Sequence, residues 1–230
     1  MPCFDEFIIR LANSAEGIFL CTRNAYKKVV EEYAAQDPWQ MAELSGARYE
    51  SGRLILEYCD MAVQATFPQG NVTLLDPGVD AGEEREEIVH NEKILILQYL
   101  TRSSGLPPRE QWLSFLELRG GQLHWLPFQK EALEPLAQAY NSRRDEFLAR
   151  GQKHGGKQFE QGDAGLIIPV LPKIPLAFAL WEGDDEFPAR SVILFDSVSE
   201  AYLPTATLYV LGIQAMIRIW FPGDTRFSEK

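Results

Sequence analysis

The sequence has few cysteines, and their placement excludes several classes of protein. Cys3, Cys21 and Cys59 are the only ones among 230 residues, and they lie far apart. No CxxC pair exists, so this chain has no zinc-ribbon or iron–sulfur motif of its own. An odd, scattered set also does not form a disulfide framework, which indicates a reducing compartment. We therefore expect a cytoplasmic protein that holds no iron–sulfur cluster itself.

Basic residues and long apolar runs are also scarce. The chain has 22 Lys and Arg against 33 Asp and Glu, a net charge of −11. An acidic surface repels phosphate backbones, so no nucleic-acid partner is expected; a cationic partner fits this charge, and solubility alone also explains it. No run approaches the roughly twenty apolar residues of a membrane span. Residues 1–21 include Asp5, Glu6 and Glu16 and lack the basic start of a signal peptide, so no membrane association is expected.

What the sequence does contain is enough apolar material for a packed core, with 46% hydrophobic and 11% aromatic residues. Helical patterns come in blocks between blocks of short β-like runs, without strict strand–helix–strand alternation. This favours an α+β fold with a mainly antiparallel sheet and helices packed on it. No repeat or long linker divides the chain. We predict a single domain, in which a helical segment over 1–50 packs on an α+β region over 51–230.

Apolar periodicity and end signals place the individual elements. Pro135 lies within one predicted helix, where a proline is unfavourable. Residues 76–87 read as an exposed loop, and 112–118 fit either a strand or a short helix. Helices are expected over 25–35, 37–44, 86–101, 127–140, 142–154 and 204–220, and strands over 53–58, 62–67, 72–75, 166–170, 174–181 and 191–195, the last three forming a meander.

The densest group of carboxylates joins the last two predicted strands. The first strand ends at Trp181, four acids follow before Phe187, and Asp196 comes just after the second strand. Carboxylates held together bind a hard cation, or one of them gains a proton through mutual repulsion and acts as a general acid. A solvated hairpin turn is the alternative. The candidate metal ligands here are Glu182, Asp184 and Glu186, and the candidate catalytic residues are Asp184, Glu186 and Asp196.

Aromatic and histidine side chains extend this candidate site. Trp181 and Phe187 flank the acids and are able to stack on a planar or cationic ligand. With His124, a plausible pocket wall next to Trp125, the predicted ligand-binding set is Trp181, Glu182, Asp184, Asp185, Glu186, Phe187 and His124.

His90 lies in the strongest predicted helix. Glu86, four residues earlier, would orient it as a metal or tetrapyrrole ligand, or else form a surface ion pair with it. No HxH or HxxxH pair exists, so a transition-metal site would need convergence from distant parts of the chain. GxSxG, GxGxxG and P-loop motifs are also absent.

Several short strings together resemble one protein family. They are ILILQYL, SFLELRGG, LWEGDDEFPARSVILFD and YLP, in this order. From about Arg53 to its end the chain is similar to an uncharacterised bacterial and archaeal family, domain of unknown function 3786. The resemblance implies a link to anaerobic metabolism or metallocofactors, because some members are joined to iron–sulfur modules. The chain departs from the family where Thr205, Ala206 and Thr207 replace acidic residues after YLP.

Three functional hypotheses follow. The first is an accessory protein of anaerobic metabolism that binds a small molecule or metallocofactor, such as a divalent metal or a tetrapyrrole, with an iron–sulfur protein as a further expected partner. The second is an enzyme that uses Asp184, Glu186 or Asp196 for acid–base or metal-assisted hydrolysis or group transfer. The third is a scaffold whose exposed final helix, bearing Leu208, Leu211 and Met216, binds another protein.

Overall fold

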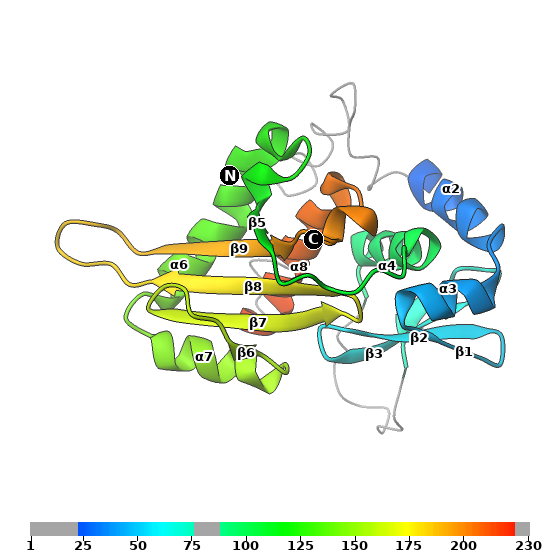
Figure 1. Cartoon of the computed structure of the whole chain (residues 1–230), viewed down its shortest axis with the longest axis horizontal. Helices are drawn as coiled ribbons and strands as arrows, with labels where there is room; N and C mark the ends of the chain where they lie inside the picture. Colours follow the sequence, from blue (N-terminus) through cyan, green and yellow to red (C-terminus); the bar gives the residue numbers. More distant parts are fainter. Residues whose placement is uncertain (1–22, 76–87, 224–230) are drawn as a thin grey trace.

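Two antiparallel β-sheets and the helices packed on them make up a single α+β domain, as the sequence predicts (Figure 1). The structure is a computed structural model, and it describes residues 23–75 and 88–223. The predictions for the N-terminal segment before Arg23, the exposed loop over 76–87 and the contact between Glu86 and His90 lie outside these residues. Within them, no helix is long and apolar enough to cross a membrane.

The smaller sheet has four strands in the order β1-β2-β3-β4. Its strands are β1 (Arg48–Glu50), β2 (Arg53–Tyr58), β3 (Met61–Thr66) and β4 (Val72–Leu74). The last three confirm the prediction, whereas the short β1 was not predicted. Ser51 and Gly52 have φ values of 50° and 74°, as a tight two-residue hairpin turn requires. The turn therefore brings β1 into register beside β2.

The larger sheet has the order β5-β9-β8-β7-β6. Its strands are β5 (Trp112–Ser114), β6 (Lys157–Gln158), β7 (Ala164–Leu171), β8 (Ile174–Trp181) and β9 (Arg190–Asp196). The meander of β7, β8 and β9 confirms the prediction. Residues 115–117 continue β5 as a 3₁₀ turn, η1 (Phe115–Glu117), so the ambiguous segment is both strand and helix. Cys59 N donates to Val170 O at 2.9 Å and joins the two sheets.

Helices pack on both sheets. Asp37 caps α3 (Pro38–Ser45) by accepting from Trp39 N and Gln40 N, as its sequence signal predicts. Both α2 (Arg23–Ala34) and α3 contact α4 (His90–Arg102), while α7 (Arg144–Lys153) packs on β7. The last helix, α8 (Thr205–Trp220), contacts α4 and α7 and lies in the core. Leu208, Leu211 and Met216 are fully buried, so the expectation that this helix is exposed is wrong.

Pro135 changes the helix predicted over 127–140. The segment is α5 (Trp125–Phe128), then a π-helical turn, η3 (Gln129–Leu133), then α6 (Glu134–Tyr140). Proline has no N–H to donate, and its ring conflicts with the carbonyl four residues earlier, here that of Glu131. The wider π turn relieves this conflict and lets the helix continue. It also sets the direction of Glu131, which faces Tyr209 of α8.

A buried ion pair ties α4 to α8. Arg218 donates from Nε and Nη2 to the two carboxylate oxygens of Glu92, each at 2.5 Å. Glu92 also accepts from Tyr58 of β2 at 2.9 Å and from Val89 N at 3.0 Å, and it is fully buried. One carboxylate therefore joins the smaller sheet to two core helices.

Candidate functional site

The acidic loop between β8 and β9 is a solvent-exposed turn, and hydrogen bonds within the loop stabilise it. The Asp184 carboxylate accepts from Phe187 N at 2.8 Å and from Glu186 N at 2.9 Å. These two bonds lower the pKa of Asp184 below its usual value. Asp184, Asp185 and Glu186 are exposed, as is Phe187, whose exposed fraction is 67%. The geometry is that of the solvated hairpin turn weighed as the alternative.

Asp196 does not join this loop. In the antiparallel pair β8–β9, Trp181 lies opposite Arg190 and Leu176 lies opposite Phe195, so Asp196 is at the other end of β9. The expected convergence of Asp196 with the loop acids is therefore wrong, because both strands are long enough to keep them apart. Asp196 is fully buried and accepts from the backbone N–H groups of Arg109, Glu110 and Val198 at 2.9, 2.6 and 2.9 Å.

The other predicted residues are also separate. The Arg190 guanidinium stacks over the Trp181 ring at 4.3 Å, which occupies the face expected to meet a ligand. His90 is the first residue of α4, and its ring lies 5.4 Å from that of Tyr26. In Figure 1 the β8–β9 loop is at one end of the molecule and α4 lies toward the other. Within residues 23–75 and 88–223, no three His, Cys, Asp or Glu residues are grouped so that they could hold a metal ion.

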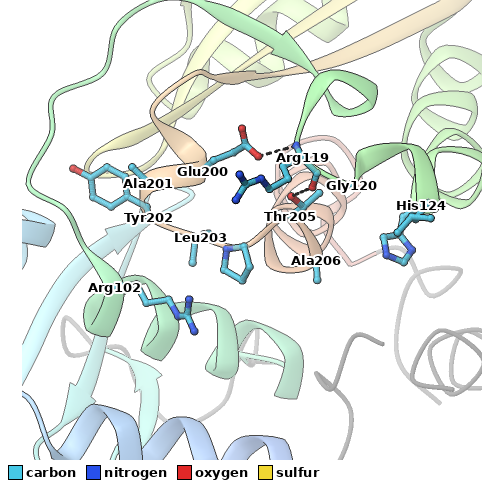
Figure 2. Close-up of a pocket in the computed structure, with 12 residues that line it drawn as sticks. Arg102, Arg119, Gly120, His124, Glu200, Ala201, Tyr202, Leu203, Thr205 and Ala206 are labelled. Atoms are coloured by element: carbon cyan, nitrogen blue, oxygen red, sulfur yellow. Dashed lines mark hydrogen bonds between the residues drawn. The ribbon is translucent and has the colours of Figure 1, made fainter. Parts of the chain in front are cut away.

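A hollow at the start of α8 is a stronger candidate, and we call it the α8 pocket. Its volume is about 880 Å³, within the range of small-molecule sites. Figure 2 shows Arg102 on one side, Arg119 and Glu200 on the other, and Thr205 and Ala206 between these and His124. Arg102 is the last residue of α4, and Arg119 precedes Gly120 in the turn before η2 (Gly121–His124).

Four donor groups of the α8 pocket have no partner among the residues that the structure describes. Thr207 N and Leu208 N donate to Pro204 O, whereas Thr205 N and Ala206 N have no acceptor in the described parts of the chain. Pro204 stands at the N-cap and supplies no side-chain cap. The guanidinium groups of Arg102 and Arg119 are exposed and form no ion pair with any described residue. The pocket therefore presents hydrogen-bond donors and two positive charges, with the Glu200 carboxylate beside them.

Hydrogen bonds fix the frame of the α8 pocket. Arg119 N donates to Glu200 Oε1 at 2.8 Å, and Thr205 Oγ1 donates to Arg119 O at 2.7 Å (Figure 2). Thr207 Oγ1 donates to Gln98 Oε1 at 2.6 Å, which ties the first turn of α8 to α4. The turn that carries Arg119 is thus attached to both η4 (Ser199–Ala201) and α8. A frame held in this way is preorganised for binding.

His124 forms one end of the wall, and its role in ligand binding stays a prediction. Its ring meets the Tyr209 ring edge-on at 6.3 Å, and Nδ1 is buried without a partner among the described residues. The Tyr209 hydroxyl donates to Glu131 Oε2 at 2.8 Å. Burial raises the pKa of Glu131, although this hydrogen bond opposes the shift. Tyr209 and Glu131 therefore form a hydrogen-bonded pair of titratable groups next to His124.

The pKa of His124 should show that its imidazole is partly buried. Burial lowers the pKa of His124, so the fold favours the neutral imidazole. The stability that this contributes is present above the unfolded-state pKa of about 6.5 and is lost as the pH falls below it toward the folded pKa. NMR titration of the imidazole protons should show His124 titrating below 6.5, with His124→Gln and His90→Gln giving the assignments. A folded-state pKa at or above 6.5 would contradict this burial.

Sequence reasoning missed Arg102 and Arg119 and favoured the loop acids. A usable signal was present, because Pro204 and Thr205 mark a helix start and helix N-termini attract anions. Arg119 also belongs to the SFLELRGG string. The sequence alone does not show that the end of α4, the Arg119 turn and the start of α8 line the same pocket.

Comparison with known proteins gives a family and no function. No curated protein and no solved structure matches the chain. One family model matches residues 37–218, which is well over half of the chain, and its description is "Domain of unknown function (DUF3786)". This match agrees with the resemblance of the four sequence strings, and the chain belongs to the DUF3786 family.

Proposed function

We propose that this protein binds a small anionic molecule in the α8 pocket. The observation that carries the proposal is the set of donors on one hollow: two guanidinium groups without carboxylate partners and two helix amides without acceptors. They occur in a chain whose net charge is −11, so overall composition does not account for them. Carboxylate and phosphate oxygens are suitable acceptors for each of these four groups.

The start of α8 suits an anion for a simple electrostatic reason. The peptide dipoles of this 16-residue helix leave a partial positive charge at its N-terminus, where the N–H groups of the first turn point outward. Acidic residues at this place, as the family resemblance implies, would themselves occupy that charge. Thr205 and Ala206 do not, and the Thr205 hydroxyl is used by Arg119 O. The positive end is therefore available to a ligand.

The arginines add specificity for carboxylate or phosphate groups. A guanidinium presents a planar fork of N–H donors that matches either group with two parallel bonds. Glu200 does not neutralise Arg119, because its carboxylate accepts from the Arg119 backbone N–H and forms no ion pair with the guanidinium. Both arginines thus keep their charge for a ligand.

Affinity for simple anions tests the proposal. Inorganic phosphate and citrate, each compared with sodium chloride at equal ionic strength, should raise the melting temperature. At ten times Kd the stabilisation is about 1.4 kcal/mol, or about 3 to 6 °C for a domain of this size. Calorimetry should then show that Arg102→Gln and Arg119→Gln each weaken binding about tenfold or more, because each removes a charge-assisted hydrogen bond.

Arg144→Gln on α7 is the matched control, since its exposed side chain loses a charge outside the pocket. It should leave both the melting-temperature shift and Kd unchanged. The proposal fails if neither phosphate nor citrate binds, or if Arg144→Gln weakens binding as much as the pocket variants do.

A metallocofactor is a narrower form of this proposal. A tetrapyrrole with carboxylate side chains has groups for Arg102 and Arg119, and His124 is the imidazole on the wall. Absorbance titration with haem, in the wild type and in His124→Gln, tests this form separately. The link to anaerobic metabolism and to an iron–sulfur partner rests on the family resemblance and stays a prediction.

Acid–base or metal-assisted catalysis by Asp184, Glu186 or Asp196 has weaker geometric support. A carboxylate with a lowered pKa, such as Asp184, stays ionised at neutral pH and is a poor general acid. The three N–H groups around Asp196 are backbone groups that it holds in place. The proposal of a binding protein therefore takes precedence over the enzyme hypothesis.

A further inference from the structure

An apolar ridge continues the α8 pocket beyond its charged end. Leu123 lines the pocket from η2, and Leu126 follows three residues later at the start of α5. Their exposed fractions are 69% and 66%, so two large apolar side chains face water beside the pocket. His124, which lies between them, has φ −119° and ψ 10°, so η2 and α5 do not form one continuous helix. We call the pair of exposed leucines, Leu123 on the pocket wall and Leu126 just after it in the chain, the apolar ridge.

We propose that the ligand of the α8 pocket is an amphipathic anion, with a carboxylate or phosphate head and an aliphatic body. The inference rests on the proposed function, because the head would lie on Arg102, Arg119 and the start of α8. The body would run past Ala206 and His124, which Figure 2 places on the side away from Arg102, and cover Leu123 and Leu126.

The order of charged and apolar groups along the pocket wall supports an amphipathic ligand. Two positive charges and two amides stand at one end, Ala206 has no side chain that could form a hydrogen bond, and the ridge of Leu123 and Leu126 follows. A fully polar anion would leave both leucines in water. An uncharged apolar ligand would leave both arginines without a partner. A molecule with a charged head and an apolar body satisfies both ends of the wall.

Chain length is the variable that tests this inference. Acetate, hexanoate and octanoate share the same head group and are compared by calorimetry at equal ionic strength, below any micelle-forming concentration. A fully buried CH₂ group tightens binding about fourfold, and an open ridge buries each only in part. We expect octanoate to bind at least about tenfold more tightly than acetate.

Variants of the two leucines show which side chains cause octanoate to bind more tightly than acetate. Leu123→Ser and Leu126→Ser should each reduce the octanoate-to-acetate ratio by about threefold or more, because each removes apolar surface beside the chain. Both side chains are largely exposed, so these variants should fold, and the melting temperature checks it. Phe187→Ser is the matched control, with an equally exposed apolar side chain on the distant β8–β9 loop, and it should leave the ratio unchanged.

The outcomes separate the two proposals. If neither phosphate nor citrate binds, the proposed function fails, whatever the three carboxylates do. If phosphate or acetate binds but octanoate is no tighter, the function stands and the amphipathic ligand is refuted. Flotation with phosphatidylglycerol vesicles is the remaining arm, and vesicle binding that is lost in Leu123→Ser would overturn the inference in favour of a membrane surface.

Discussion

Replacing Arg218 by methionine should lower the free energy of unfolding by about 3 to 5 kcal/mol. The change removes both guanidinium bonds to the fully buried Glu92, whose carboxylate then keeps only Tyr58 and Val89 N as the donors described here. A buried charge without its counter-ion is costly, whereas the methionine itself fills most of the vacated volume. Urea unfolding followed by tryptophan fluorescence measures the loss.

The double variant Glu92→Leu with Arg218→Met separates the cost of the unpaired Glu92 charge from the cost of losing the Arg218 side chain. It removes both ions, so it should recover at least half of the stability lost by Arg218→Met, although the Tyr58 hydroxyl then loses its acceptor. Tyr58→Phe alone should cost only about 1 kcal/mol, the usual net value of one hydrogen bond. A loss below about 1 kcal/mol for Arg218→Met would show that Glu92 becomes protonated or hydrated instead, and would contradict the argument.

Most secondary structure was predictable because its causes are local. Asp37 and Pro38 start α3 by capping, and the apolar runs of β7, β8 and β9 fix both the strands and their meander. Pro135 was recognised as a problem, but a sequence pattern does not reveal whether a helix breaks or widens. The structure shows that it widens into a π turn at Gln129–Leu133.

For the candidate site, the sequence indicates single residues but not how they are arranged. His124 lines the α8 pocket and not the acidic loop with which its sequence position grouped it. The loop contains many acids, but the number of acids in a sequence does not show where their side chains point. The Asp184 carboxylate accepts hydrogen bonds from the backbone of its own loop. Arg102 and Arg119 come from elements far apart in sequence, so only tertiary packing brings them to the start of α8. Glu92 and Arg218, separated by 126 residues, are a second example of this limit.

The second large effect is expected at Asp196, which sequence reasoning placed among the catalytic candidates. Asp196→Ala should lower the free energy of unfolding by about 2 to 4 kcal/mol, because three backbone N–H groups lose their acceptor and each unsatisfied buried donor costs about 1 to 3 kcal/mol. Two of these donors, Arg109 and Glu110, belong to the exposed loop before β5, where water offsets some of the loss. Glu110 has a positive φ of 56°, and the Asp196 carboxylate holds it there.

Asp196→Asn separates a structural role from a catalytic one. Its amide keeps one oxygen for an N–H donor, but its NH₂ group then faces another donor, so a loss between those of the wild type and Asp196→Ala is expected from the same unfolding experiment. A residue kept for catalysis at the expense of stability would do the opposite, since its replacement leaves the fold unchanged or more stable. The exposed Asp184→Asn, whose carboxylate holds only its own turn, is the matched control and should change stability much less. If Asp196→Asn instead leaves stability unchanged or raises it, Asp196 is not the clamp between β9 and the loop before β5, and its burial would require a functional explanation.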